Sequence, residues 1–112
     1  MAEADDDAAR ARLKTALDAV RARFVAGLEA RTGALAELAL AARERRSPGP
    51  DLARADLLRG LHSIAGSAPT VGLRDLGARA RVLEAMVAAA ERDGRGVPDI
   101  VEDIRSLAAY RT

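Results

Sequence analysis

Residues 51–68 read DLARADLLRGLHSIAGSA, and this stretch decides the fold. On a helix that turns about 100° per residue, its apolar side chains gather on one side. They are Ala53, Leu57, Leu61, Ile64 and Ala68. One apolar stripe on an otherwise polar helix is typical of a helix packed on a core. His62 points about 130° away from the centre of that stripe, so we expect an exposed histidine.

Three clusters of helix-breaking residues bound this helix and divide the rest of the chain. They are SPGP at 47–50, PTVG at 69–72 and DGRGVP at 93–98. The remaining stretches, residues 6–46, 73–92 and 98–110, also have helical spacing of apolar residues. Short connections between amphipathic helices are typical of a bundle. The sequence therefore predicts a single all-α domain over residues 1–112, an antiparallel four-helix bundle.

Each of the three stretches that flank residues 51–68 has its own expected inward face. In 6–46 this face is one continuous stripe, made of Leu13, Leu17, Val20, Phe24, Leu28, Leu35, Leu38 and Ala42. In the two later stretches it is made of Leu73, Leu76, Ala80, Leu83, Val87 and Ala90, and of Val101, Ile104, Leu107 and Ala108. Glycine costs about 1 kcal/mol inside a helix relative to alanine. The long first helix is therefore either continuous or kinked or broken near Gly33.

The composition agrees with helices and excludes several kinds of site. The chain has 112 residues, of which 27 are Ala and 14 are Leu, and only 2% are aromatic. It has no Cys and a single His, which excludes thiolate and multi-histidine metal sites. A net charge of +1 is not the basic excess that nucleic-acid binding needs. No apolar run is long enough to span a bilayer, and the acidic residues 1–7 do not resemble a signal peptide. We expect a cytoplasmic protein that binds no nucleic acid, membrane, metal or cofactor.

The surroundings of His62 are unusual for an exposed helix face. On the helical wheel Ala55, Leu58, Ala65 and Gly66 surround the imidazole, and Arg59 lies one turn before it. A small, apolar surface around one nucleophile indicates a docking site for a partner protein. Neutral imidazole has a free ring nitrogen that can attack an activated phosphoryl group. No glycine-rich phosphate loop is present and no carboxylate lies one turn away. The partner would therefore have to supply the metal ion.

The segment HSIAGSAPTVGL at 62–73, followed by Leu76 and Leu83-Glu84, resembles the signature of histidine-containing phosphotransfer (HPt) domains. The resemblance implies that His62 accepts a phosphoryl group at Nε2 from an aspartyl-phosphate of one receiver domain and passes it to an Asp of another. The partners would be receiver domains of a hybrid histidine kinase or a response regulator, which carry Mg²⁺. The family usually has Lys three residues after the histidine, where this chain has Ala65. Arg59 and Arg74 are candidates to replace that charge.

Two other functions remain open from the sequence. A phosphoacceptor module like that of chemotaxis kinases would receive phosphate from an ATP-binding kinase domain. An adaptor would bind a receiver domain without transfer, which the Ala65 substitution favours. A lone exposed histidine can also be surface decoration.

Overall fold

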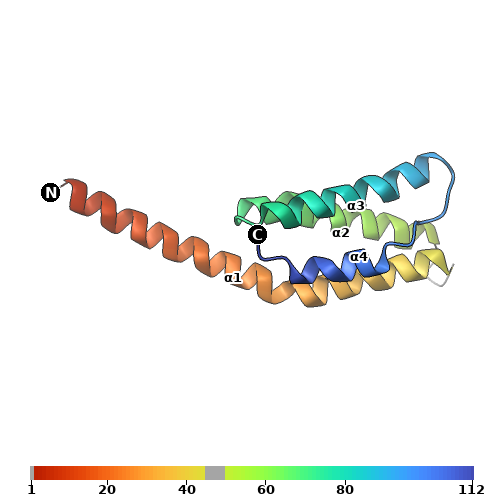
Figure 1. Cartoon of the computed structure of the whole chain (residues 1–112), viewed down its shortest axis with the longest axis horizontal. Helices are drawn as coiled ribbons and strands as arrows, with labels where there is room; N and C mark the ends of the chain where they lie inside the picture. The colour runs from red at the N-terminus through yellow and green to blue at the C-terminus, as the bar shows by residue number, and fades with distance from the viewer. Residues whose placement is uncertain (1, 45–49) are drawn as a thin grey trace.

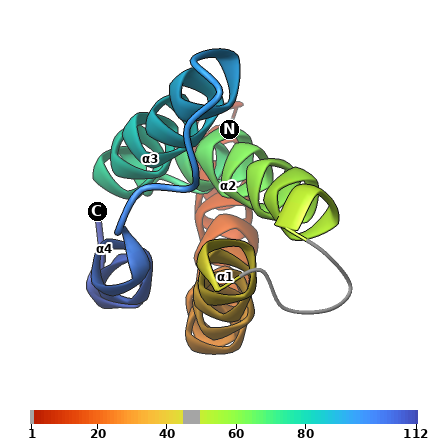
Figure 2. The same cartoon turned by 90° about the vertical axis from the view of Figure 1, so that its right-hand side faces the viewer.

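The computed structural model describes residues 2–44 and 50–112, and within them the chain is built from helices. Helix α1 spans Ala2–Arg43, α2 spans Pro50–Thr70, α3 spans Arg74–Arg92 and α4 spans Val101–Ser106, with a short 3₁₀ helix at Leu107–Ala109. In Figure 1 α1 is much longer than the others, and in Figure 2 the helices surround a common interior. The predicted all-α bundle is confirmed.

Helix α1 begins earlier than residue 6, where the sequence placed its start, and continues without a break through Gly33. Acidic side chains in its first turn suit the positive end of the helix dipole. Its last helical residue is Arg43, and Glu44 is in a turn. The predicted ending at residue 46, and the turn cluster at 47–49, lie outside the described residues.

The boundaries of the later helices differ from the predictions at specific prolines. Helix α2 includes Pro69, which the sequence assigned to a turn, and the connection to α3 is reduced to Val71, Gly72 and Leu73. Gly72 has φ +85°, a conformation that side chains rarely adopt. Pro98 does not begin the last helix, since regular α-helix starts at Val101. Instead, the Pro98 carbonyl accepts a hydrogen bond from the Ile100 backbone N–H in the preceding turn. The predicted 98–110 helix is therefore shorter.

The core is aliphatic and lies where α2, α3, α4 and the second half of α1 meet. All five residues predicted for the inward face of 51–68 are fully buried, and all six predicted for 73–92 are buried. In the last stretch Val101, Ile104 and Leu107 are buried and Ala108 is half-buried. Burial of large aliphatic side chains is the main source of stability in such a bundle.

Ion pairs and hydrogen bonds show the directions of neighbouring helices. Arg43 meets Asp99 and Glu37 meets Arg105, each at 3.9 Å, so α1 and α4 run in opposite directions. Arg79 of α3 binds Asp103 of α4 at 3.0 Å. Helix α4 packs mainly against α1.

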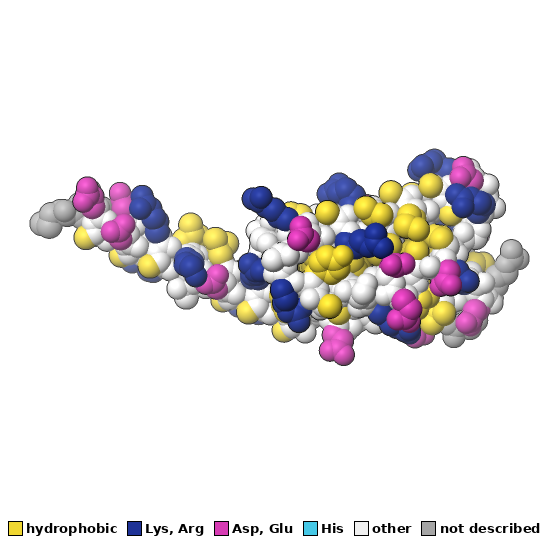
Figure 3. All heavy atoms as spheres, in the orientation of Figure 1, with side chains coloured by type: hydrophobic (Ala, Val, Ile, Leu, Met, Phe, Trp, Pro, Cys, Tyr) yellow, Lys and Arg dark blue, Asp and Glu magenta, His cyan; other side chains and the backbone are white. Residues whose placement is uncertain are grey.

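The N-terminal part of α1 projects beyond the bundle (Figure 1), and the molecule measures 64 × 24 × 20 Å. Leu13, Leu17 and Val20, predicted to be core residues, are 60%, 51% and 40% exposed. That prediction is wrong because the other helices do not extend along this part of α1. Figure 3 shows hydrophobic side chains on the projection among charges of both signs.

Candidate functional site

His62 lies on the outer side of α2, as the helical wheel predicted. Its side chain is 78% exposed, whereas Leu61 and Ile64 of the same turn are fully buried. The core residues fix the rotation of α2, so the backbone holds the imidazole at the surface. A partner can therefore reach the ring directly.

The imidazole is held by a carboxylate from the neighbouring helix. His62 Nδ1 lies 2.7 Å from Glu84 Oε2, and the Glu84 side chain is only 23% exposed. An ionised carboxylate only accepts hydrogen bonds, so Nδ1 carries the proton and donates it. In the neutral ring the lone pair is then on Nε2. Within the described chain Nε2 makes no hydrogen bond.

Sequence reasoning assigned no role to Glu84, because it considered carboxylates one turn away on the same helix. Glu84 follows buried Leu83 on α3, 22 positions after His62. The Leu-Glu pair of the family signature was the available signal. The residue pairing that brings Glu84 to His62 depends on how α2 and α3 pack.

Two contacts set the register between α2 and α3. An added Cβ at Gly77 would lie 2.6 Å from the Pro69 ring and 3.2 Å from the Ala65 carbonyl oxygen. Only glycine therefore allows this close approach. Gly77 lies opposite Pro69 and Glu84 opposite His62, so the two helices are antiparallel. The tight turn at Gly72 and the contact at Gly77 together place Glu84 level with the histidine.

The residues predicted around His62 divide into two groups. Gly66 and Arg59 are exposed and Ala55 is half-buried, so these three remain available to a partner. Leu58 is half-buried against the core, and Ala65 is only 1% exposed. The prediction that Ala65 lies on the open surface is wrong, because Ala65 lies on the side of α2 that meets α3.

Gly66 is not required by the packing of this chain. Apart from the local backbone of α2, an added Cβ there would meet no described atom within 4 Å, and the residue is exposed in mid-helix. Alanine would stabilise the helix by about 1 kcal/mol relative to glycine. The bare backbone one turn after His62 therefore leaves room for an approaching molecule.

The predicted positive charges lie less favourably than expected. Arg59 is one turn from His62, but its guanidinium is paired with Asp56. Arg74 is the first residue of α3, ten positions before Glu84, which places it about 15 Å away along the helix. The expectation that Arg74 stands beside His62 is therefore wrong.

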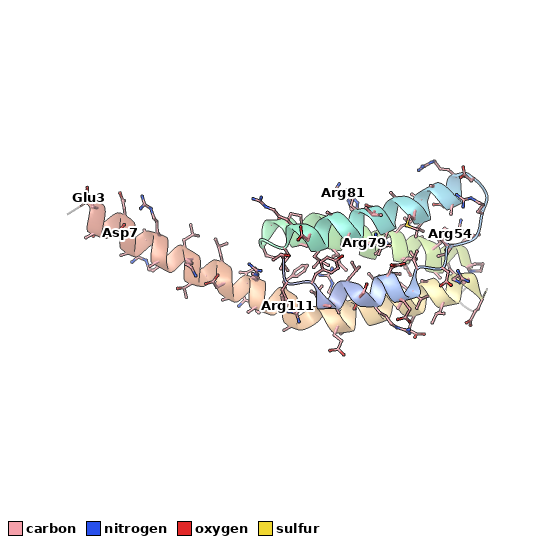
Figure 4. All side chains as sticks on the ribbon, viewed as in Figure 1. Glu3, Asp7, Arg54, Arg79, Arg81 and Arg111 are labelled. Carbon is pink, nitrogen blue, oxygen red and sulfur yellow. The ribbon has the colours of Figure 1, made fainter. Side chains whose placement is uncertain are left out.

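Arg81 is an arginine that sequence reasoning missed. Arg81 precedes Glu84 by three residues on α3, so the two residues are about one helical turn apart along the axis and about 60° apart around it. It is exposed, and among the described residues its side chain has no hydrogen bond or ion pair. Figure 4 shows Arg79 directed toward α4 and Arg81 directed away from it. Arg81 is therefore a free positive charge on the side of α3 that carries Glu84.

A second missed arginine comes from α1. Arg31 donates a hydrogen bond to the hydroxyl of Ser63, the residue after His62, at 3.2 Å. Its guanidinium also lies 5.3 Å from the centre of the Phe24 ring, within range of a cation–π interaction. These contacts hold a positive charge on the α1 side of the histidine.

The described residues contain no group of three or more His, Asp or Glu that could hold a metal ion. None of the described helices is both long and apolar enough to cross a membrane. The site therefore offers one oriented nucleophile at the surface with arginines on either side.

The Hpt domain family model matches residues 9–111, nearly the whole chain, including His62 and Glu84. The chain belongs to the Hpt domain family. Domains of this family carry out histidine phosphotransfer in two-component phosphorelays, with receiver domains as their partners. No match was found among curated proteins or among solved structures.

Proposed function

We propose that His62 is the phosphoacceptor of a phosphorelay and that Nε2 is the reacting atom. The observation that carries this proposal is the 2.7 Å contact between His62 Nδ1 and Glu84, which leaves the lone pair on the exposed nitrogen. The donor is the aspartyl-phosphate of a receiver domain, and the acceptor is the Asp of another receiver domain.

The proposed phosphoryl transfer needs no additional base, because no proton has to leave the ring for Nε2 to react. The Nε2 lone pair attacks phosphorus, a P–N bond forms, and the bond between phosphorus and the aspartyl oxygen breaks, which releases the carboxylate. The ring becomes an N-phosphoimidazolium that keeps its Nδ1 proton. The Glu84 carboxylate beside that proton stabilises the new positive charge. The second transfer reverses these bond changes on the next receiver.

The receiver supplies the rest of the site under this proposal. It brings Mg²⁺ and an acidic pocket, and the bundle contributes a positioned nucleophile. Gly66 and the half-buried Ala55 and Leu58 form the docking surface. Arg59, paired with Asp56, borders it on α2, and Arg81, which has no ion pair among the described residues, attracts the phosphoryl group.

The test incubates the full chain with several ³²P-labelled receiver domains and Mg²⁺. We expect label to move to the chain within minutes as acid-labile phosphohistidine and to return to a second, unlabelled receiver. Labelling only by a kinase catalytic domain with ATP would instead indicate a chemotaxis-type phosphoacceptor. Binding of receivers without any labelling would indicate an adaptor. Either outcome overturns the relay.

Glu84 is expected to act as a positioning residue. Glu84→Ala should slow phosphoryl acceptance by about 10- to 100-fold, because the ring can rotate and place a proton on Nε2. Glu84→Gln keeps a carbonyl acceptor for Nδ1–H and should retain most of the rate. Since His62 is the only histidine, ¹⁵N NMR of the imidazole reports its tautomer directly. An unchanged tautomer and rate in Glu84→Ala would refute this role.

Arg81 is expected to contribute charge without contributing to stability. Arg81→Ala should slow transfer by about two- to fivefold, the range for one exposed charge interaction. The effect should decrease as salt is raised. Arg74→Ala is the matched control on the same helix and should change the rate less. Equal effects of the two substitutions would show that only overall charge matters.

A further inference from the structure

The projecting part of α1 exposes an apolar stripe that the bundle does not use. Leu13, Leu17 and Val20 follow one another at intervals of four and three residues and are 60%, 51% and 40% exposed. This spacing is that of a coiled-coil seam. A solitary helix segment of this length is marginal in water. The projection therefore has the features of a helix that packs against another.

Charges along the projection are segregated by sign. Glu3, Asp5, Asp6 and Asp7 lie at the start of the projection, whereas the bases follow them along the helix, with Asp18 as the only acid among them: Arg10, Arg12, Lys14, Arg21 and Arg23. Four of these charges are already paired within the helix, because Lys14 binds Asp18 at 2.8 Å and Arg10 lies 3.5 Å from Asp7. A parallel neighbour of the same sequence would set acid against acid. An antiparallel one would set acid against base.

One unpaired acid and one unpaired base are suitably placed for such a contact. Asp5 and Arg23 have no hydrogen bond or ion pair within the described chain. They are 18 residues apart, five full turns, so both lie on the same edge of the stripe. In an antiparallel pair that edge faces the same edge of the partner.

We propose that this stripe binds a second copy of the chain in an antiparallel helix pair. In this pair Leu13 of one copy packs against Leu17 of the other. Asp5 of one copy and Arg23 of the other are then offset by only about 3 Å along the helix axis. The symmetry forms each of these contacts twice.

The dimer leaves the phosphotransfer site open. Arg31 of α1 donates a hydrogen bond to Ser63, so Ser63 and the adjacent His62 lie near the position of Arg31 along the axis of α1. His62 is therefore about 20 Å along α1 from Leu17. The dimer and the relay are independent, so loss of one does not imply loss of the other.

Sedimentation of the full chain over a range of concentrations tests the proposal. We expect a reversible dimer, and Leu17→Glu should weaken it by more than about tenfold because the charge is buried in both copies. Ala22→Glu on the opposite side of the same helix is the matched control and should dimerise normally. Circular dichroism of both variants shows that α1 still forms. A wild-type chain that stays monomeric at millimolar concentration, or equal effects of both substitutions, would overturn the proposal.

Two further comparisons test the orientation. The chain lacks cysteine, so Ala16→Cys, near the two-fold axis, should give a disulfide-linked dimer, and Ala9→Cys should not. Asp5→Arg and Arg23→Asp should each weaken the dimer, and the double variant should restore it. Rapid cross-linking of Ala9→Cys would indicate a parallel pair. Stripe-dependent binding to anionic vesicles by a monomer would indicate a membrane surface, and each result rejects the antiparallel dimer.

Discussion

His62→Gln is expected to abolish phosphoryl acceptance, leaving no more label than a reaction without the protein. The glutamine amide nitrogen has a delocalised lone pair and cannot attack phosphorus, so no other atom replaces Nε2. The amide can still donate to Glu84, and the side chain stays exposed. We therefore expect the free energy of unfolding to change by less than about 1 kcal/mol.

The measurement compares initial rates of label transfer from one phosphorylated receiver to wild type and variant. Equal receiver binding by the two proteins, measured by calorimetry, separates loss of chemistry from loss of docking. Label on His62→Gln at the wild-type rate would move the phosphoacceptor to another residue and refute the proposed role.

Leu61→Ala is expected to cause the largest loss of stability, about 2–5 kcal/mol. Leu61 is fully buried among the core residues of α2, next to the histidine. Truncation removes apolar burial and leaves a cavity that the rigid helices fill only in part. The midpoint of thermal unfolding should fall by more than about 10 °C.

Leu52→Ala is the matched control for this substitution. It makes the same chemical change on the same helix, but Leu52 is 60% exposed. We expect a change below about 0.5 kcal/mol in denaturant unfolding. Similar losses in the two variants would show that helix propensity, rather than core packing, dominates the stability of α2.

Local periodicity was sufficient to predict the helices and much of the core. Residues such as Leu57, Leu76 and Ile104 recur at helical spacing, and each lies on the side that the wheel assigned to the interior. The exposure of His62 followed from the same geometry. These features depend on residues within a few turns of one another, and sequence reveals such relations directly.

The same periodicity failed where burial depended on other elements. Leu13 and Leu17 have the spacing of core residues but are exposed, because none of the other described helices lies alongside that part of α1. Ala65 was placed on the open surface although α3 covers it. Arg74 was placed near the site although the helix rise carries it about 15 Å away.

The sequence by itself determined the helical class, the core face of each later helix and the presence of one exposed nucleophile in a signature typical of Hpt domains. Only the tertiary structure decided that Glu84 holds His62 through Nδ1, and that among the described residues Arg81 has no ion pair and the stripe of α1 has no partner. The physical reason is the register of α2 against α3, which Gly72 and Gly77 fix through a turn and a close backbone contact. Contacts between residues distant in the chain arise from that packing, which helical periodicity does not encode.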